Sequence, residues 1–245
     1  MSSVFWVRIQ ERDMLLYSKL PLVFNVHEMQ NDVFRLEQQL WQKHYNAQNF
    51  EGSWTVIPLY SLGGKAESIL SVHAENAANL HYEPTVYLQQ CPYLLEVIQS
   101  FQFPLQSVRL MKLNAGSIIK EHMDYQLSFE EGEVRLHIPI ITNDNVEFYV
   151  QDERIIMNEG ECWYLNLSLR HRVSNNGKTD RVHLVIDGKV NDWLRAMLNT
   201  SVITQTTTVK NEQFDKETIQ KIIQELLQQG TQTAIDLADK LRTQL

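Results

Sequence analysis

Between residues 107 and 187 the chain runs in short segments of alternating apolar and polar residues, separated by turn signals. A period of two is the pattern of a strand with one buried face, and Asn, Asp and Gly residues between such segments favour tight turns. Eight short segments within one stretch predict a jelly roll, in which two sheets pack face to face. The predicted strands are Val108–Leu113, Ile118–Tyr125, Val134–Ile140, Val146–Val150, Arg154–Met157, Glu161–Leu167, His171–Asn175 and Arg181–Asp187.

The flanking residues are predicted to add helices, so the fold class is mainly β with α additions. Apolar residues at helical spacing predict a helix within Glu28–His44 and another over Pro92–Phe101, and an apolar run over Thr55–Leu59 predicts a strand. At 245 residues the chain suits one such domain with extensions. We assign residues 1–104 to an N-terminal α+β region that packs on the core, and residues 105–198 to the jelly-roll core itself.

The last segment, residues 199–245, returns to helical spacing, and Gly230 is placed to end a first helix. This pattern predicts a helical hairpin. Its apolar stripe needs a cover, either the sandwich or a second copy of the chain, and the second option would make the protein a homodimer. The stripe consists of Ile219, Ile222, Ile223, Leu226 and Leu227, followed by Ile235, Ala238 and Leu241.

Net charge and cysteine content limit which binding partners and which cellular compartment we expect for this protein. A net charge of −8 and the lack of any Lys/Arg run argue against nucleic acid as a partner, because phosphate binding needs a basic face. The first residues show no apolar run long enough for a signal peptide or a membrane span, so we expect no membrane partner and a cytoplasmic location. In that reducing compartment Cys91 and Cys162 are expected to be buried apolar residues without a disulfide.

His122 and Asp124 stand two residues apart on a predicted strand, so both side chains leave the same face. Both can then reach one cation. His171, from a distant strand, would complete a facial triad of two histidines and one carboxylate. Such a triad leaves coordination positions open and is typical of non-haem Fe(II) oxygenases, so we predict that His122, Asp124 and His171 bind a metal.

The His-x-Asp triplet is too short to be specific by itself. Two similar triplets, His73–Glu75 and His81–Glu83, lie in an Ala-rich stretch whose pattern is partly helical, where residues two apart point in different directions. A lone histidine is also most often a hydrogen-bonded or surface residue. The metal hypothesis therefore depends on the residues that accompany the triad.

Arg181 follows His171 by ten residues, across the turn at Asn175–Gly177. A three-residue loop would pair the two positions and direct both side chains to one face, whereas a two-residue loop would put them on opposite faces. If the two strands instead belong to facing sheets, residues 171 and 181 are not paired. In that case only the even number of positions between them on alternating strands still links the two side chains. An arginine near the metal can bind the far carboxylate of a keto-acid co-substrate with two charge-assisted hydrogen bonds.

Arg135 and His137 form a second pair two residues apart and are predicted to point into the same sandwich, while their apolar neighbours take the other face. Strand interiors seldom carry such residues without a ligand or ion that satisfies them. The alternative is an internal ion pair of Arg135 with one of the nearby glutamates, Glu130, Glu131 or Glu133.

With these residues in place, the chain resembles the aspartyl/asparaginyl β-hydroxylase family of 2-oxoglutarate oxygenases. The resemblance covers about residues 107–194, and the tail after residue 199 lies outside it. Asp124 is similar to the carboxylate of the bacterial-type members, including proline hydroxylases, which the animal peptide hydroxylases lack. The stretches that carry the resemblance are VRLMKLNAGSIIKEHMD, VRLHIPIITND, GECWYLNLSLRHRVSNNGKTDRVHLVID and VNDWL.

This resemblance implies a double-stranded β-helix core with Fe(II), 2-oxoglutarate and O2 as requirements. It also implies hydroxylation of an unactivated carbon of an amino acid, free or in a short peptide, with release of succinate and CO2. It assigns Arg181 to 2-oxoglutarate and places Arg135 and His137 near co-substrate and substrate. We expect His137 to face the co-substrate and Arg135 to bind a substrate carboxylate. The alternative is a cupin-like metal-binding isomerase or a ligand-sensing module without oxygenase activity.

Overall fold

A computed structural model describes residues 8–39, 41–68, 81–213, 216–229, 237–239 and 241–242. The chain divides into two compact units, residues 15–206, and residues 1–14 with 207–245. The helices are α1 (Val26–Arg35), α2 (Pro92–Gln99), α3 (Asp192–Asn199) and α4 (Lys216–Gln229). The strands are β1 (Arg8–Val23), β2 (Gln42–Lys43), β3 (Phe50–Glu51), β4 (Trp54–Leu62), β5 (Tyr82–Pro84), β6 (Leu105–Leu113), β7 (Ile118–His122), β8 (Glu133–Ile141), β9 (Val146–Val150), β10 (Glu153–Arg154), β11 (Glu161–Leu165), β12 (His171–Asn175), β13 (Arg181–Lys189) and β14 (Ile203–Gln213).

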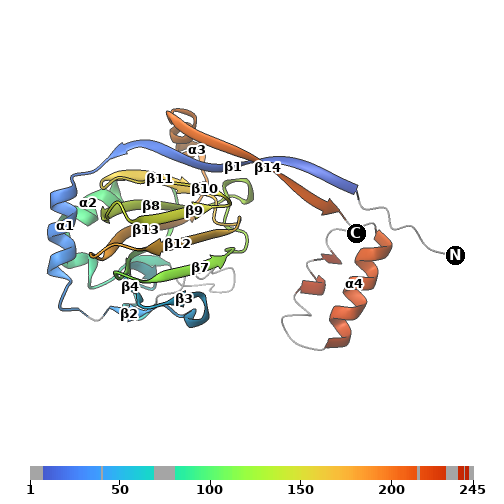
Figure 1. Cartoon of the computed structure of the whole chain (residues 1–245), viewed down its shortest axis with the longest axis horizontal. Coiled ribbons are helices and arrows are strands. Elements are labelled where there is room, and N and C mark those ends of the chain that lie inside the picture. Colours follow the sequence, from blue (N-terminus) through green and yellow to red (C-terminus); the bar gives the residue numbers. More distant parts are fainter. Residues whose placement is uncertain are drawn as a thin grey trace. The chain divides into compact units, whose positions relative to one another are not determined.

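The described strands form two sheets, which make up the predicted jelly roll (Figure 1). The larger sheet has the order β14-β1-β11-β8-β13-β6-β4-β2, with β5 beside β4, and the smaller has the order β10-β9-β12-β7-β3. Neighbours such as β8 and β13, or β7 and β12, run antiparallel. The fold is therefore mainly β with helical additions, as predicted.

Alternation along the central strands of the larger sheet separates an apolar face from a polar one. On β8, Leu136 and Ile138 point to one side and are fully buried, whereas Arg135 and His137 belong to the other side and line a cavity. The neighbouring strand β13 follows the same rule, with Leu184 on the apolar side. One face of the sheet thus stabilises the fold, and the other is available for chemistry.

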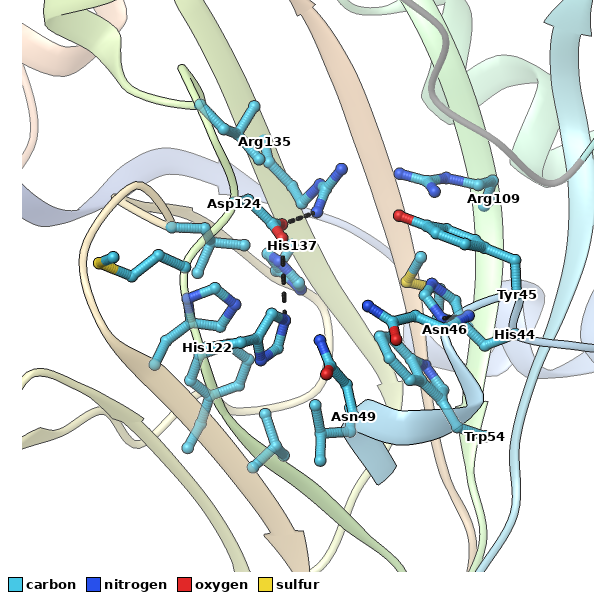
Figure 2. A pocket seen from close by; sticks show the side chains of 18 of the residues that line it. His44, Tyr45, Asn46, Asn49, Trp54, Arg109, His122, Asp124, Arg135 and His137 are labelled. Atoms are coloured by element: carbon cyan, nitrogen blue, oxygen red, sulfur yellow. Dashed lines mark hydrogen bonds and ion pairs between the residues drawn. The ribbon is translucent and has the colours of Figure 1, made fainter. Parts of the chain in front are cut away.

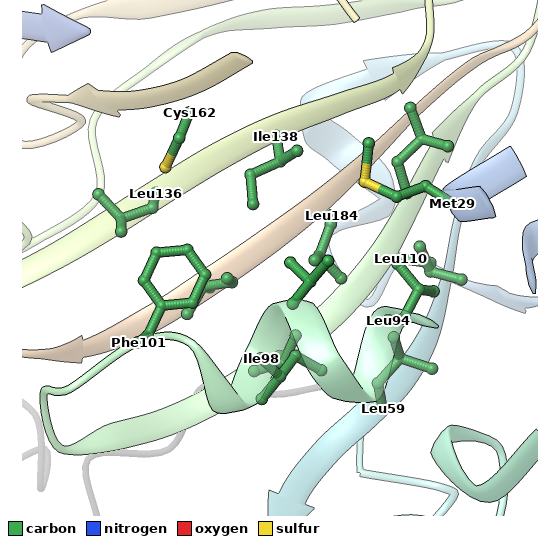
Figure 3. Packing of buried hydrophobic residues seen from close by; sticks show 14 of the residues in the cluster. Met29, Leu59, Leu94, Ile98, Phe101, Leu110, Leu136, Ile138, Cys162 and Leu184 are labelled. Carbon is green, nitrogen blue, oxygen red and sulfur yellow. The ribbon is translucent and has the colours of Figure 1, made fainter. Parts of the chain in front are cut away.

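Helices cover the apolar face. α2 lies across the sheet with Leu94 and Ile98 turned toward it, and Met29 of α1 joins the same cluster (Figure 3). The spacing of these residues explains why both segments are helical, since positions three or four apart share one face. Pro92 occupies the first turn of α2, where a missing N–H costs no hydrogen bond.

Most of the predicted strands of the core are confirmed, with changes at their ends. β9 and β12 have the predicted bounds. The strand predicted over Arg154–Met157 is wrong beyond Arg154, the single residue it shares with β10, and the strand predicted over Ile118–Tyr125 ends at His122. β12 pairs with β7 and β9, while β13 pairs with β6 and β8, so His171 and Arg181 lie on different sheets. A hairpin ladder between residues 171 and 181 is therefore wrong, and the two strands pass to different sheets.

Upstream, the helix predicted within Glu28–His44 is shorter than that range, since α1 ends at Arg35 and β2 follows. The partly helical structure predicted for the stretch with His81–Glu83 is wrong there, because β5 begins at Tyr82. His73–Glu75 lies outside the described residues. The strands β1 and β14 were not predicted from the sequence.

The second unit contains the predicted C-terminal helix. α4 buries Ile219 and Ile223 against Ala238, with Leu226 and Leu241 packed beside them, so part of the predicted stripe is covered within the unit itself. Gly230 lies outside the described residues. A homodimer stays a prediction.

Among the described residues, no helix has both the length and the apolar character that a membrane crossing requires. Cys91 and Cys162 are buried and unpaired, as predicted. Burial raises the pKa of the Cys91 thiol to about 12, so this thiol remains protonated.

Ile138→Ala should destabilise the core. This side chain is fully buried on β8, between β11 and β13, and its truncation would leave a cavity that costs about 2–5 kcal/mol. Urea unfolding followed by tryptophan fluorescence measures the change. In Val202→Ala, whose side chain is 95% exposed, the free energy of unfolding should stay within about 0.5 kcal/mol of wild type. Equal effects of the two substitutions would contradict this account of the core.

Candidate metal centre

A cavity of about 330 Å³ lies between the polar face of the larger sheet and the smaller sheet. That volume is in the range of small-molecule sites. The larger sheet contributes Arg135, His137 and Arg181, and the smaller sheet contributes His171. The sequence placed these residues in one sandwich, and the structure brings them to one cavity.

His122, Asp124 and His171 gather at this cavity as predicted. Their ligand atoms all lie within 4.8 Å of one another, and the two imidazole ring centres are 4.2 Å apart. His122 and His171 are directly paired between β7 and β12, which explains their proximity. Two imidazoles and one carboxylate suit Fe(II) and leave coordination positions open, so the donor set fits a non-haem iron site.

Both histidines are oriented for coordination through Nε2. His122 Nδ1 lies 2.8 Å from the carbonyl oxygen of Lys120, and His171 Nδ1 lies 2.9 Å from that of Leu169. A carbonyl oxygen can only accept, so each Nδ1 carries the proton and each Nε2 has a free lone pair. Burial, together with the nearby His122, lowers the pKa of His171 to about 4, so this ring is neutral and able to bind a metal.

Asp124 lies beside His122 and His171 because of a different backbone conformation from the predicted one. β7 ends at His122, and the backbone N–H of Asp124 donates to the carbonyl oxygen of Leu167 instead of extending the strand. Its Oδ1 still lies 3.7 Å from His122 Nε2 (Figure 2). The pairing of His122 with Asp124 is correct, but the strand-parity argument for it is wrong at Asp124.

Arg135 points into the cavity and forms an internal ion pair, although not with the nearby glutamates. Its Nε and one terminal nitrogen donate to Asp187 over 2.6 and 3.1 Å. Its other terminal nitrogen donates to Asp124 over 2.6 Å (Figure 2). Burial disfavours its charge, but the carboxylates of Asp187 and Asp124 more than offset this and raise the pKa of Arg135. Arg109 also donates to Asp187.

Arg181 is buried at the start of β13, six residues before Asp187 and so toward the other end of the polar sheet face from Arg135. One terminal nitrogen donates over 2.7 Å to Nδ1 of His183, a neutral ring whose pKa is lowered by burial and by the charge of Arg181. Within the described part of the chain no carboxylate forms an ion pair with Arg181, and burial lowers its pKa to about 9. Both ring nitrogens of His137 are buried without a partner there. This corner therefore presents unsatisfied donors.

A wall that sequence reasoning missed closes the cavity on the side of β2 and β4. His44 stacks on Trp54 with ring centres 3.5 Å apart, and Tyr45, Asn46 and Asn49 complete the wall (Figure 2). The N–H of Asn46 donates to His44 Nδ1, and burial lowers the pKa of His44 to about 3. No spacing in the sequence pointed to this wall, which forms only when β2 pairs with β4.

Asp187, His183 and Arg109 were also missed, but a signal existed. Asp187 and His183 share the parity of Arg181 on β13, and β13 pairs residue by residue with β6, which carries Arg109. Extending the alternation rule from Arg181 along its own strand would have found the two β13 residues.

Comparison with known proteins gives one family. The family described as aspartyl/asparaginyl beta-hydroxylase matches residues 24–190. An L-proline cis-4-hydroxylase from Rhizobium meliloti (strain 1021) is 31% identical over 139 residues, which are 56% of this chain and 48% of that protein. An L-proline cis-3-hydroxylase from a Streptomyces species is 29% identical over 141 residues, covering 56% of this chain and 47% of that protein.

The chain thus matches about half the length of these curated relatives. Among solved structures, a 2OG-Fe(II) oxygenase family oxidoreductase from Burkholderia pseudomallei has a TM-score of 0.48 and 15% identity. That similarity covers 71% of this chain and 86% of the other.

His171→Ala should abolish stoichiometric metal binding. The wild-type chain is expected to bind one Co(II) per monomer, because two imidazoles and a carboxylate converge. Isothermal titration under nitrogen measures the stoichiometry. His27→Ala, which alters an exposed histidine on α1, should bind Co(II) like the wild type. Unchanged Co(II) binding by His171→Ala would place the metal elsewhere.

Acid should destabilise the fold partly through His44. Its pKa is about 3 in the folded chain and near 6.5 when unfolded, so the unfolded state binds the proton first and stability falls as pH drops below about 6.5. Between pH 7 and pH 5, the free energy of unfolding of His44→Phe, which keeps an aromatic ring on Trp54, should fall by up to about 2 kcal/mol less than that of the wild type. Urea unfolding at both pH values tests this, and equal losses would refute it.

Proposed function

Because this chain belongs to the aspartyl/asparaginyl β-hydroxylase family, we propose that it is an Fe(II)- and 2-oxoglutarate-dependent hydroxylase of a small amino acid, free or in a short peptide. The observation that carries the proposal is the presence, in one cavity, of a metal-binding triad and a buried arginine without a carboxylate partner among the described residues. The proline hydroxylases that resemble this chain support the amino-acid substrate.

His122, Asp124 and His171 would hold the iron through His122 Nε2, one Asp124 oxygen and His171 Nε2. When bound, iron and 2-oxoglutarate together supply the oxidising power needed to hydroxylate an unactivated carbon, with O2 consumed and with succinate and CO2 as co-products. The protein's own task is to bind and orient the reactants and to limit water around them.

Arg181 would anchor the distal carboxylate of 2-oxoglutarate. A buried cation without a counter-ion is costly, so its presence favours an anionic ligand. The planar guanidinium can fork onto a carboxylate, and the hydrogen bond from Arg181 to His183 fixes the direction of that fork. His137, whose ring nitrogens lack partners in the described structure, would face the same co-substrate.

The substrate carboxylate would bind at the other end of the cavity, where Arg109 and Arg135 lie. Two guanidiniums share Asp187 there, and a metal on Asp124 would take part of the second carboxylate's charge. The remaining positive charge favours an anionic group. Three of the five N–H groups of Arg135 donate to Asp187 and Asp124, so Arg135 keeps two for a ligand.

Turnover tests the function directly. We expect the chain with Fe(II), ascorbate and 2-oxoglutarate to add one oxygen atom to L-proline or another small L-amino acid, detected as a gain of about 16 mass units with matching succinate. Arg181→Ala should weaken anaerobic 2-oxoglutarate binding by about 150–4000-fold, because it removes a buried bidentate contact worth about 3–5 kcal/mol.

Arg172→Ala is the matched control. Arg172 stands beside His171 but stacks on Tyr149 and pairs with Glu121, so its removal should change 2-oxoglutarate affinity by no more than about twofold. If the protein binds metal without consuming O2 in the presence of 2-oxoglutarate and any amino acid tested, the cupin-like isomerase or ligand-sensing module becomes the better description.

A further inference from the structure

Each of the three residues at the metal centre has an orienting partner, but only one of these partners is a charged side chain. His122 and His171 donate to backbone carbonyls two residues upstream. Asp124 instead accepts a hydrogen bond from Arg135, at 2.6 Å. The orientation of the carboxylate therefore depends on what holds Arg135.

Asp187 holds Arg135. This carboxylate is 1% exposed and accepts from two nitrogens on one edge of the Arg135 guanidinium, Nε at 2.6 Å and a terminal nitrogen at 3.1 Å. Ser107 and Arg109 also donate to it. With one edge of the guanidinium fixed in this way, the remaining terminal nitrogen points at Asp124 (Figure 2).

The two oxygens of Asp124 are consequently not equivalent. Oδ2 accepts from Arg135, whereas Oδ1 lies 3.7 Å from His122 Nε2, on the side of the other two ligands. A carboxylate that chelated the metal through both oxygens would occupy one more position than a single oxygen does. The facial triad would then leave two open positions instead of three.

We infer that Asp187, acting through Arg135, is a positioning residue that restricts Asp124 to binding the metal through Oδ1 alone. This inference rests on the proposed function, because it concerns the same metal centre. It gives Asp187 a role in the site although Asp187 does not line the cavity. It also explains why the position of Arg135 suits arginine, since a lysine ammonium has no planar edge that could hold Asp187 with two parallel hydrogen bonds while also donating to Asp124.

Mn(II) binding, measured by electron paramagnetic resonance without substrate, tests the inference. Arg135→Lys keeps the charge but loses the fork, and Asp187→Asn removes the anchor. Each should weaken Mn(II) binding by about 10–100-fold, as expected when a ligand loses its orienting partner. Water proton relaxation of the saturated Mn(II) complexes should show fewer exchangeable waters than in wild type, because Asp124 can then chelate.

Asp32→Asn is the matched control for simple loss of stability. Asp32 is also a buried carboxylate that pairs with an arginine, Arg35, and accepts from the backbone N–H of Leu94, but it does not line the cavity. It should lower the unfolding temperature and leave Mn(II) affinity and water number as in wild type. If Asp187→Asn fails to fold, Arg135→Lys decides.

Arg135→Lys or Asp187→Asn variants that fold and match wild type in Mn(II) affinity and water number would overturn the inference and leave the proposed function intact. Failure of the proposed function gives a different result. In that case the wild-type chain itself would bind no Mn(II), or His122→Ala would bind it equally well.

Discussion

The structure depends on the alternation of side chains across the central strands of the larger sheet. Leu136, Ile138 and Leu184 face the helices and form a continuous apolar cluster, which supplies the stability of this part of the chain. The intervening positions face the cavity and need not contribute to the core. Arginine and histidine can therefore be placed at the centre of the sheet without interrupting its packing.

Burial of so many cations on the cavity face has to be compensated. At one end Asp187 accepts from Arg109 and Arg135, and Asp124 takes a further hydrogen bond from Arg135, so charge is nearly balanced within the protein. At the other end, the hydrogen-bond and ring partners of Arg181 among the described residues are the neutral side chains of His183 and Phe148. The two ends of the cavity therefore differ: Arg109 and Arg135 are paired with carboxylates of the protein at one end, whereas Arg181 at the other end has no carboxylate partner among the described residues.

Much of the fold and of the candidate site follows from local patterns. The period of two placed seven of the eight predicted strands of the core, and two of them, β9 and β12, have the predicted ends. The same rule put Arg135 and His137 on the inner face. The pairing of the strands could not be predicted from these local patterns. β12 and β13 are consecutive but lie in different sheets, because a jelly roll distributes successive strands between facing sheets. The N-terminal strand β1, which pairs with β11, was not predicted from the sequence.

The sequence by itself determined the family, the mainly β fold, and the residue types that gather at the metal centre, because these depend on short-range periodicity and on a few motifs. Only the tertiary structure decided which carboxylates neutralise Arg135, that Asp124 lies beyond the end of its strand, and that His44 and Trp54 close the cavity. The physical reason is sequence separation. Asp187 and Arg135 are 52 residues apart, and no local preference encodes which distant charges meet when two strands pair.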